Sequence, residues 1–282
     1  MSALGMDVEA STEPGSGRGD MIGSSLFPIA TLWIEGHLGP IERLCLASFV
    51  AHGHQVTLFA YGDITGLPPG VIQVDARTIL PEAEARANRY ENGSYALFSN
   101  LFRYELLRRG LGLWVDTDVV CVQPIRASEE FVAGWESPDF INGAVLFAEV
   151  GSAFIADALT AFRSGRIPAW APWHKVLHCY ARQLLGQPIP ATALPHGTFG
   201  PKGVTALAKR HGLTSLAQPR EVFYPVPPRS ARKVFDPDYR LADVVRPTTL
   251  AIHLWNEKLR DIKHTAPPVG SLLRSLYERY GM

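Results

Sequence analysis

Short apolar runs alternate along the chain with segments in which apolar residues recur at the spacing of a helix. The runs of strand length, rich in β-branched residues, occupy residues 27–34, 54–61, 71–74, 131–135, 141–147 and 248–255. The segments of helical periodicity occupy residues 41–53, 95–109, 152–163, 174–184 and 271–279. Strands that alternate with helices favour an α/β layer structure. We therefore expect a single α/β domain over residues 26–282.

Two regions lack this pattern. Residues 1–25 are rich in Gly, Ser and acidic residues and have neither the basic start nor the apolar run of a signal peptide, so we interpret them as a disordered tail. Residues 187–228 contain many prolines and glycines, which predicts long loops packed on the core rather than a second sheet.

The composition excludes several classes of protein. The 282 residues are 46% hydrophobic, enough for a sizeable core. Because 27 Lys and Arg balance 27 Asp and Glu, no bulk attraction to nucleic acid or to an anionic membrane surface is expected. No apolar run reaches the roughly 18 residues of a transmembrane helix. Three widely spaced cysteines without a CxxC pair indicate a reducing compartment, and we expect a cytoplasmic protein.

Two carboxylates interrupt the most apolar predicted strand, residues 111–125 (LGLWVDTDVVCVQPI). In extended backbone, residues two apart point to the same side, so Asp116 and Asp118 would project into one space. Adjacent like charges beside buried residues are costly unless a positive charge neutralises them, and Mn²⁺ or Mg²⁺ is the simplest candidate. The alternative is a solvated loop with two acidic caps.

The preceding helix adds an amide and a guanidinium. Asn100 and Arg103 are three residues apart and share a helix face, and the short link through Gly110 and Gly112 brings that face close to the acidic pair. Such donors suit sugar hydroxyls and phosphate oxygens. The alternative for Arg103 is an ordinary surface ion pair.

These residues resemble the signature of a known enzyme family. The run FSNLFRYELLRRGLGLWVDTDVVC, residues 98–121, is similar to the DxD glycosyltransferases of the GT-A fold, in particular the retaining family 32 group of capsular and lipopolysaccharide sugar transferases, α-1,4-glycosyltransferases and glucosylating clostridial toxins. Here Leu111 separates the two glycines that are adjacent in the family. Asn100 stands where many members have Asp, which keeps a hydrogen-bond acceptor but loses a charge.

The resemblance extends to the segments around this motif. IATLWIEGHLGPIERLCLASFVAHGHQVTLFAYGD is similar to the family's first strand, helix and second strand, which implies that Trp33 stacks on the uracil of the donor. GWESPDFINGAVLF implies a place for Asn142 near the sugar, and FGPKGVTAL is similar to the family's Gly-Pro step before a helix, at Gly200 and Pro201. For Trp33 the alternative is an ordinary core residue.

The segment AIHLWNEKLR resembles the C-terminal strand end at which these enzymes supply a further metal or diphosphate ligand. The matching residue is His253, and imidazole is a good Mn²⁺ ligand when a partner holds its other nitrogen. Trp255 would then pack near the leaving phosphate, and Lys258 or Arg260 could neutralise it. A lone His on an apolar strand is also a common satisfied core group.

The resemblance implies both a fold and a reaction. The fold is the GT-A type, with a Rossmann-like mixed sheet flanked by helices. The reaction is transfer of a sugar from a nucleotide diphosphate, most readily a UDP-sugar, to a glycan or lipid-linked saccharide, with retention. Mn²⁺ or Mg²⁺ would bind Asp116, Asp118 and His253, with Thr117 at the diphosphate and Asn100 and Arg103 at the sugar.

The partners of this reaction are only coarsely indicated. We expect the acceptor to be recognised by residues 165–245, and peripheral contact with a membrane stays open. The basic C-terminal positions are better interpreted as a solvated face than as a lipid anchor.

Two other functions are compatible with parts of the sequence. An apolar strand followed by DTDVV approximates the motif of haloacid-dehalogenase-like phosphatases, in which Asp116 would be the nucleophile and Asp118 a metal ligand. Against this, Asp236 and Asp238, the later acidic pair, flank a proline instead of ending a strand. The second alternative is a non-catalytic module that binds a nucleotide sugar.

Overall fold

The computed structural model of the chain describes residues 25–34, 36–127 and 130–282. Its strands are β1 (Ile29–Leu32), β2 (Gly36–His37), β3 (Val56–Ala60), β4 (Ile64–Thr65), β5 (Val71–Asp75), β6 (Leu113–Val115), β7 (Val119–Cys121), β8 (Phe131–Trp135), β9 (Ile141–Ala148) and β10 (Ala251–His253). Its α-helices are α1 (Pro40–Ala51), α2 (Glu82–Ala87), α3 (Ala96–Arg108), α4 (Ala153–Arg163), α5 (Leu177–Leu184), α6 (Pro201–Arg210), α7 (Arg220–Phe223), α8 (Leu241–Val244) and α9 (Leu272–Arg279). The 3₁₀ helices are η1 (Ala76–Thr78), η2 (Trp173–Lys175), η3 (Ala191–Ala193), η4 (Pro228–Phe235) and η5 (Asn256–Leu259).

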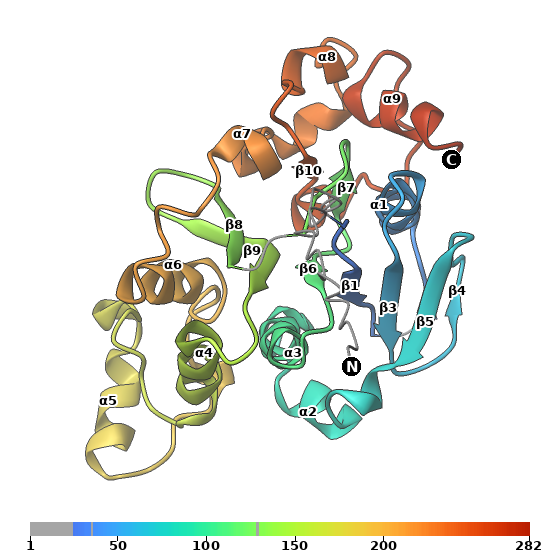
Figure 1. The fold of residues 1–282 in the computed structure, drawn as a ribbon. Helices are drawn as coiled ribbons and strands as arrows, with labels where there is room; N and C mark the ends of the chain where they lie inside the picture. The colour runs from blue at the N-terminus through green and yellow to red at the C-terminus, as the bar shows by residue number, and fades with distance from the viewer. Residues whose placement is uncertain (1–24, 35, 128–129) are drawn as a thin grey trace, which may run out of the picture.

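A mixed sheet of six strands forms the centre of the molecule, in the order β5-β3-β1-β6-β9-β8 (Figure 1). Strands β5, β3, β1 and β6 are parallel, whereas β9 runs antiparallel to both β6 and β8. Two short sheets, β10 with β7 and β2 with β4, complete the strand pairing of the described residues. The predicted α/β class, with a mixed central sheet flanked by helices, is confirmed.

Both faces of the central sheet are buried, which explains the unbroken apolar runs in the sequence. Leu113 and Val115 of β6 belong to the core cluster that includes Leu46 and Phe49 of α1. Trp114, between them, belongs to the opposite cluster, which includes the apolar residues of α3. Because alternate residues of a strand point to opposite faces, α1 and α3 cover the two faces of the same strands.

The strand order changes direction at β1. From β1 the chain continues outward to β3 and β5 on one side, and then returns through α3 to place β6 on the other side of β1. The carboxyl ends of β1 and β6 therefore lie side by side at a switch point, where open α/β sheets form a crevice for ligands. Trp33 directly follows β1, and Asp116 directly follows β6.

The strand predicted over residues 111–125 is broken in the structure. Asp116, Thr117 and Asp118 form a turn between β6, which belongs to the central sheet, and β7, which pairs with β10. In this turn the N–H of Val119 donates to the carbonyl oxygen of Asp116 at 3.1 Å. The extended backbone expected through Asp116–Asp118 is instead a turn. The contiguous apolar residues on both sides, in β6 and β7, resemble one strand in the sequence and hide it.

The region predicted as long loops also contains regular structure. Residues 187–228 include the ten-residue helix α6, which begins at the Gly200–Pro201 step and buries Val204, Leu207 and Ala208. These three residues have the i, i+3, i+4 spacing of one helix face, and α6 packs on β9 and α4. The density of glycines and prolines in the surrounding sequence hid this periodic stretch, although the family resemblance implied a helix after Gly200 and Pro201.

Other boundaries differ by a few residues, and one predicted helix is divided. The segment 174–184 splits at Val176 into η2 and α5, so the two exposed histidines His174 and His178 lie on different elements.

Of the predicted tail, residues 1–24 lie outside the described part of the chain. Ser25 is already held by the main chain, because its carbonyl oxygen accepts from the N–H of Ala127 at 2.8 Å.

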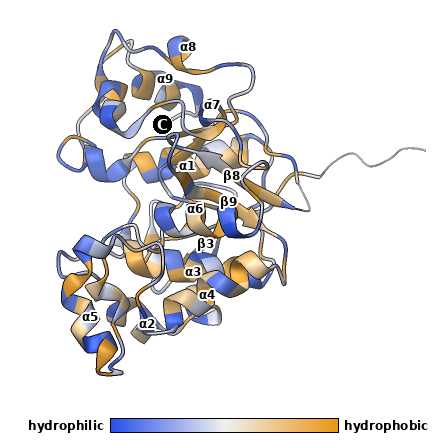
Figure 2. Ribbon diagram, turned by 90° about the vertical axis from the view of Figure 1, so that its left-hand side faces the viewer, coloured by the Kyte–Doolittle hydropathy of each residue, from blue (hydrophilic) through white to orange (hydrophobic). Residues whose placement is uncertain are grey.

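Some of the helices mark the two ends of the molecule. Helices α8 and α9 lie at one end and α2 and α5 at the other in both views (Figures 1 and 2). Among the helices of the described residues, none combines the length and the apolar character needed to cross a bilayer.

Gly112 provides a test of the link between α3 and β6. Its φ is +120°, and a Cβ atom there would lie 2.2 Å from the carbonyl oxygen of Pro28. We expect Gly112→Ala to lower the free energy of unfolding by about 3 kcal/mol or more, because both backbone strain and a clash with main chain must be relieved. The measurement is denaturant unfolding of the full chain.

Gly151→Ala is the matched control. Gly151 has a φ of +82° but open space around its Cβ position, so only the conformational cost of about 1 kcal/mol applies. Equal losses of unfolding free energy in the two variants would contradict the close approach of Gly112 to the carbonyl oxygen of Pro28.

Candidate functional site

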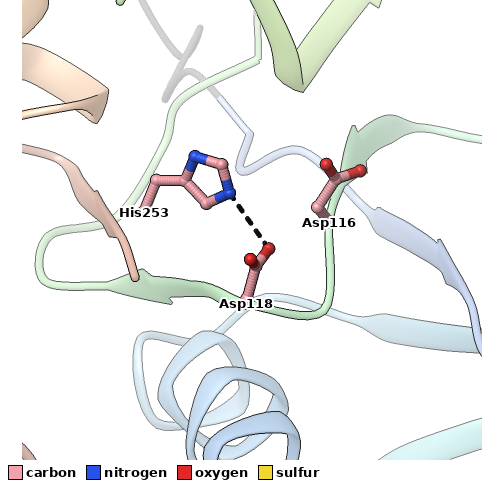
Figure 3. Close-up of side chains that lie close together, drawn as sticks. All are labelled: Asp116, Asp118 and His253. Atoms are coloured by element: carbon pink, nitrogen blue, oxygen red, sulfur yellow. Dashed lines mark hydrogen bonds and ion pairs between the residues drawn. The ribbon is translucent and has the colours of Figure 1, made fainter. Parts of the chain in front are cut away.

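The turn between β6 and β7 places two carboxylates and one imidazole together (Figure 3). One ligand atom each from Asp116, Asp118 and His253 lie within 4.8 Å of one another. His253 comes from β10, which pairs with β7 so that His253 is opposite Val119. Pairing of β10 with the strand after the turn therefore brings a residue 135 positions away in sequence to the acidic pair.

Asp116 is neutralised from the α3 side. Nη2 of Arg103 and Nε1 of Trp114 both donate to its Oδ1 at 2.7 Å, and Nη1 of Arg103 donates to Oδ1 of Asn100 at 3.1 Å. The Arg103 side chain is only 6% exposed, and its guanidinium lies 5.0 Å from the centroid of the Trp114 ring. The convergence predicted for Asn100, Arg103 and Asp116 is thus present in the structure.

Asp118 is held from the β10 side. Nε2 of His253 lies 3.1 Å from its Oδ1, and the backbone N–H of Asn256 donates to its Oδ2 at 2.8 Å. Burial by itself would raise the pKa of Asp118, but the charge and hydrogen bond of His253 and the Asn256 N–H outweigh it and lower that pKa. Conversely, burial would lower the pKa of His253, and the surrounding carboxylates, Asp118 first, raise it.

The backbone at Trp255 has a left-handed conformation, with φ 59° and ψ 54°. It is the only residue other than glycine with a positive φ in the described chain. Nε1 of Trp255 donates to the carbonyl oxygen of Val226 at 2.7 Å, and its ring centroid lies 4.0 Å from that of His253. These contacts stabilise a backbone conformation that costs of order 1–3 kcal/mol and that directs the next N–H, of Asn256, at Asp118.

Two cavities meet at Asp116, which lines both. The Trp33 cavity, about 450 Å³, lies at the carboxyl end of β1 and is also lined by Tyr95, Thr117 and Asp118. The Arg103 cavity, about 400 Å³, lies on the other side of Asp116. Its polar lining includes Asn100, Arg103, Glu136, Asn142, His196, Lys202 and His253.

The structure brings most of the predicted site residues to these cavities. Trp33 and Thr117 line the Trp33 cavity, and Asn142 lines the Arg103 cavity, where its amide donates to Oε2 of Glu136 and its Oδ1 accepts from the N–H of Ala144. Trp255 and Lys258 line neither cavity. Trp255 packs against His253, and Lys258 is exposed on η5.

Sequence reasoning missed a buried polar cluster behind Asp118. Glu42, on the first turn of α1, has a side chain only 1% exposed, and its Oε1 accepts from Asn256 Nδ2 at 2.7 Å and from Lys263 Nζ at 2.9 Å. Because Asn256 also binds Asp118, this cluster connects α1 with the acidic turn. A Glu in a first helical turn normally faces solvent near the helix N-terminus, so only the fold shows that Glu42 is buried.

Glu136 is the second residue that was missed. It directly follows β8, lines the Arg103 cavity, and has a pKa raised chiefly by burial. An acidic residue at the end of a predicted strand was a signal in the sequence that pointed to this position.

Buried polar atoms without a protein partner concentrate around the two cavities. They include Oγ1 of Thr31 and Nε1 of Trp33 at the first cavity, and Nε of Arg103 and Nδ1 of His253 at the second. Buried polar groups in native proteins are nearly always hydrogen-bonded, and unpaired ones call for an explanation such as a ligand, an ion or water. These four atoms belong to residues that line the two cavities, and each calls for such a partner there.

Comparisons with known proteins find similarity both in sequence and in structure. No protein-family model matches the chain. Lactosylceramide 4-alpha-galactosyltransferase of Rattus norvegicus is 28% identical over 199 residues, which cover 68% of this chain and 49% of that protein. The chain therefore spans about half the length of this curated relative.

Among solved structures, the PaToxG glycosyltransferase aligns with a TM-score of 0.43 and 13% identity, over 68% of this chain and 73% of that one. This likeness is too low to support an inference about the site. Both proteins are named as glycosyltransferases.

The Glu42 cluster can be tested by a double-mutant cycle. Lys263→Met removes the cation from a buried carboxylate, and we expect it to lower the free energy of unfolding by about 3 kcal/mol. Glu42→Gln removes the charge itself, so the double variant should recover a large part of this loss. The measurement is chemical denaturation of the two single variants and the double variant.

Additive losses would mean that the two side chains are not coupled, against the 2.9 Å contact in the structure. Arg274→Met, which removes an exposed ion pair with Glu278, is the matched control and should change stability by less than about 1 kcal/mol.

Proposed function

We propose that the chain is a metal-dependent glycosyltransferase that moves a sugar from a nucleotide diphosphate donor, a UDP-sugar, to a hydroxyl group of a glycan or lipid-linked saccharide. The observation that supports this most directly is the cluster of Asp116, Asp118 and His253 at the junction of two cavities. The sequence similarity to the Rattus enzyme, named as a galactosyltransferase, supports the same reaction class.

The donor set of the cluster suits a hard or borderline divalent cation. Two carboxylates and an imidazole are ligands that Mn²⁺ accepts. Nε2 of His253 and Oδ1 of Asp118 are 3.1 Å apart, so both groups are near enough to hold one cation. Nδ1 of His253 is buried without a protein partner, so the described residues do not supply the partner that was expected at its other nitrogen. When bound, such a cation supplies a Lewis acid for the charge that develops on the departing diphosphate.

We assign the nucleoside to the Trp33 cavity. Trp33 offers a ring face on which a base can stack, and its Nε1 and the neighbouring Thr31 hydroxyl are buried atoms that lack a protein partner. Thr117 lies between this cavity and the acidic turn, next to the position that the diphosphate would occupy.

We assign the donor sugar to the Arg103 cavity. Asn100, Arg103, Asn142 and Glu136 surround it with donors and acceptors that match sugar hydroxyls. Lys202 lines the same cavity and has no ion pair among the described residues, so it is better placed than the exposed Lys258 to face an anionic substrate group.

The proposed transfer proceeds with retention and needs no strong protein base. The bond between the anomeric carbon and the phosphate oxygen breaks, the acceptor oxygen bonds to that carbon from the same face, and its proton passes to the leaving phosphate oxygen. Arg103 holds the sugar while its Nη2 donates to Oδ1 of Asp116 at 2.7 Å. Retention rests on the resemblance of the DxD region to retaining enzymes.

The acidic pair is the direct test of this function. We expect wild-type protein with Mn²⁺ to release UDP from at least one member of a panel of UDP-sugars, since hydrolysis of the donor needs no known acceptor. Asp116→Asn and Asp118→Asn should each lower the rate by at least about 10²- to 10³-fold, because each removes charge at the centre of the site. The measurement is UDP release at saturating donor.

Asp63→Asn, at an exposed position outside both cavities, is the control and should retain the full rate. Unchanged rates in both site variants would remove the acidic pair from the mechanism. Release of inorganic phosphate from a monoester, without UDP release, would favour the phosphatase alternative. UDP binding without metal dependence or turnover would favour a binding module.

Trp33 tests the assignment of the nucleoside. Loss of a base–aromatic stack costs about 1–3 kcal/mol, so Trp33→Ala should weaken UDP binding by about 5- to 150-fold, and Trp33→Phe by less. The measurement is calorimetric titration with UDP and Mn²⁺. Trp173→Ala, at an exposed position on η2, should leave the affinity unchanged. Equal UDP affinity of Trp33→Ala and wild type would place the base elsewhere.

A further inference from the structure

Charge is distributed unevenly along this neutral chain. Residues 158–220 contain no Asp or Glu and eight Lys or Arg, so the rest of the chain is net negative. Within the described structure, Arg163 pairs with Glu84 and Glu105 and Arg210 with Asp157. The other six cations of this segment, Arg166, Lys175, Arg182, Lys202, Lys209 and Arg220, form no ion pair with a described residue. The segment is therefore a source of uncompensated positive charge.

The same segment exposes several large apolar side chains. Trp173, Leu177, Leu184 and Leu185 are between 57% and 87% exposed, whereas Cys179 is the only residue of α5 that is buried. Leu177 and Leu184 are seven residues apart and share one outward face of the helix. Helix α5 lies at the periphery of the molecule in both views, and Figure 2 shows hydrophobic stretches along it.

We propose that η2 and α5 dock on the surface of a lipid bilayer that contains anionic lipids. An outward face of Trp and Leu flanked by Lys175 and Arg182 is the pattern of an element that lies in a membrane interface. The cations of residues 158–220 add an electrostatic attraction that only a negative surface would supply. A second copy of this chain would bring the same positive segment, so like charges disfavour a symmetric dimer through this face.

A groove lies between this face and the Arg103 cavity. The groove, about 320 Å³, shares Phe140 and Lys202 with the cavity and reaches Trp170 and Pro172, the residue before Trp173. This step, and no other step of the inference, rests on the proposed function. Given that function, the groove gives a saccharide attached to a membrane lipid a path to the donor sugar.

The experiment is sedimentation of the full chain with vesicles of phosphatidylcholine, with and without phosphatidylglycerol, in the absence of metal and nucleotide. We expect binding to the anionic vesicles that weakens with salt, and little binding to the neutral ones. Leu184→Ser combined with Leu185→Ser should weaken it on the order of tenfold or more, and Lys175→Gln combined with Arg182→Gln by roughly 20- to 30-fold.

Val269→Ser and Lys233→Gln are the matched controls, because Val269 is 81% exposed and Lys233 is an exposed cation on η4, both outside residues 158–220. Their binding should equal that of wild type, and thermal unfolding of every variant shows that the fold is kept. Failure to sediment with anionic vesicles would overturn the proposal. Equal vesicle binding by wild type and by the two double variants would also overturn it. So would self-association of the wild type without lipid, if the same substitutions abolish it.

UDP release from a soluble donor, measured on the same variants, separates this inference from the proposed function. The α5 variants should release UDP at the wild-type rate. Vesicle binding by a protein that hydrolyses no UDP-sugar would support the docking face and overturn the glycosyltransferase assignment.

Discussion

Two carboxylates in a partly buried turn repel each other, and the surrounding structure is organised to offset that repulsion. At the separations in this cluster, within 4.8 Å, two like charges in a medium of intermediate polarity repel by about 3–4 kcal/mol. This exceeds the net contribution of one neutral hydrogen bond, about 1 kcal/mol, so a single neutral contact cannot stabilise the pair. Arg103 offsets Asp116, and His253 with the Asn256 N–H offsets Asp118. The two negative charges are therefore offset without substrate, and buried polar atoms without a protein partner remain beside both cavities.

The topology determines where this pair lies. Because β1 and β6 are neighbours at the switch point, the segments that follow them share one crevice, and Trp33 and Asp116 line the same cavity although 83 positions separate them. The antiparallel pairing of β10 with β7 then adds His253 and the turn at Trp255. Three distant parts of the chain thus meet at one edge of the sheet, and α3 closes the site with Asn100 and Arg103.

The sequence was informative where chemistry and local periodicity coincide. The α/β class, the helix that includes Asn100 and Arg103, and the meeting of Arg103 with Asp116 could be predicted, because they depend on spacing within 20 residues. The break at Asp116–Asp118 could not be predicted. The apolar residues before and after it belong to two different sheets, but nothing in the sequence distinguishes the two sets. Glu42 and Lys263 were beyond reach for another reason. Their contact joins α1 to a loop near the C-terminus, and only the packed structure shows that both are removed from solvent.

The central claim is that Asp116, Asp118 and His253 hold a divalent cation that in turn holds the diphosphate of a donor. Titration of Mn²⁺ followed by electron paramagnetic resonance, with and without UDP, tests it most directly, because free and bound Mn²⁺ give distinct signals and binding couplings are reciprocal. The account predicts binding to wild-type protein that UDP tightens, and loss of both binding and coupling in Asp118→Asn and His253→Ala. Mn²⁺ binding of equal strength in wild type and both variants, indifferent to UDP, would contradict it.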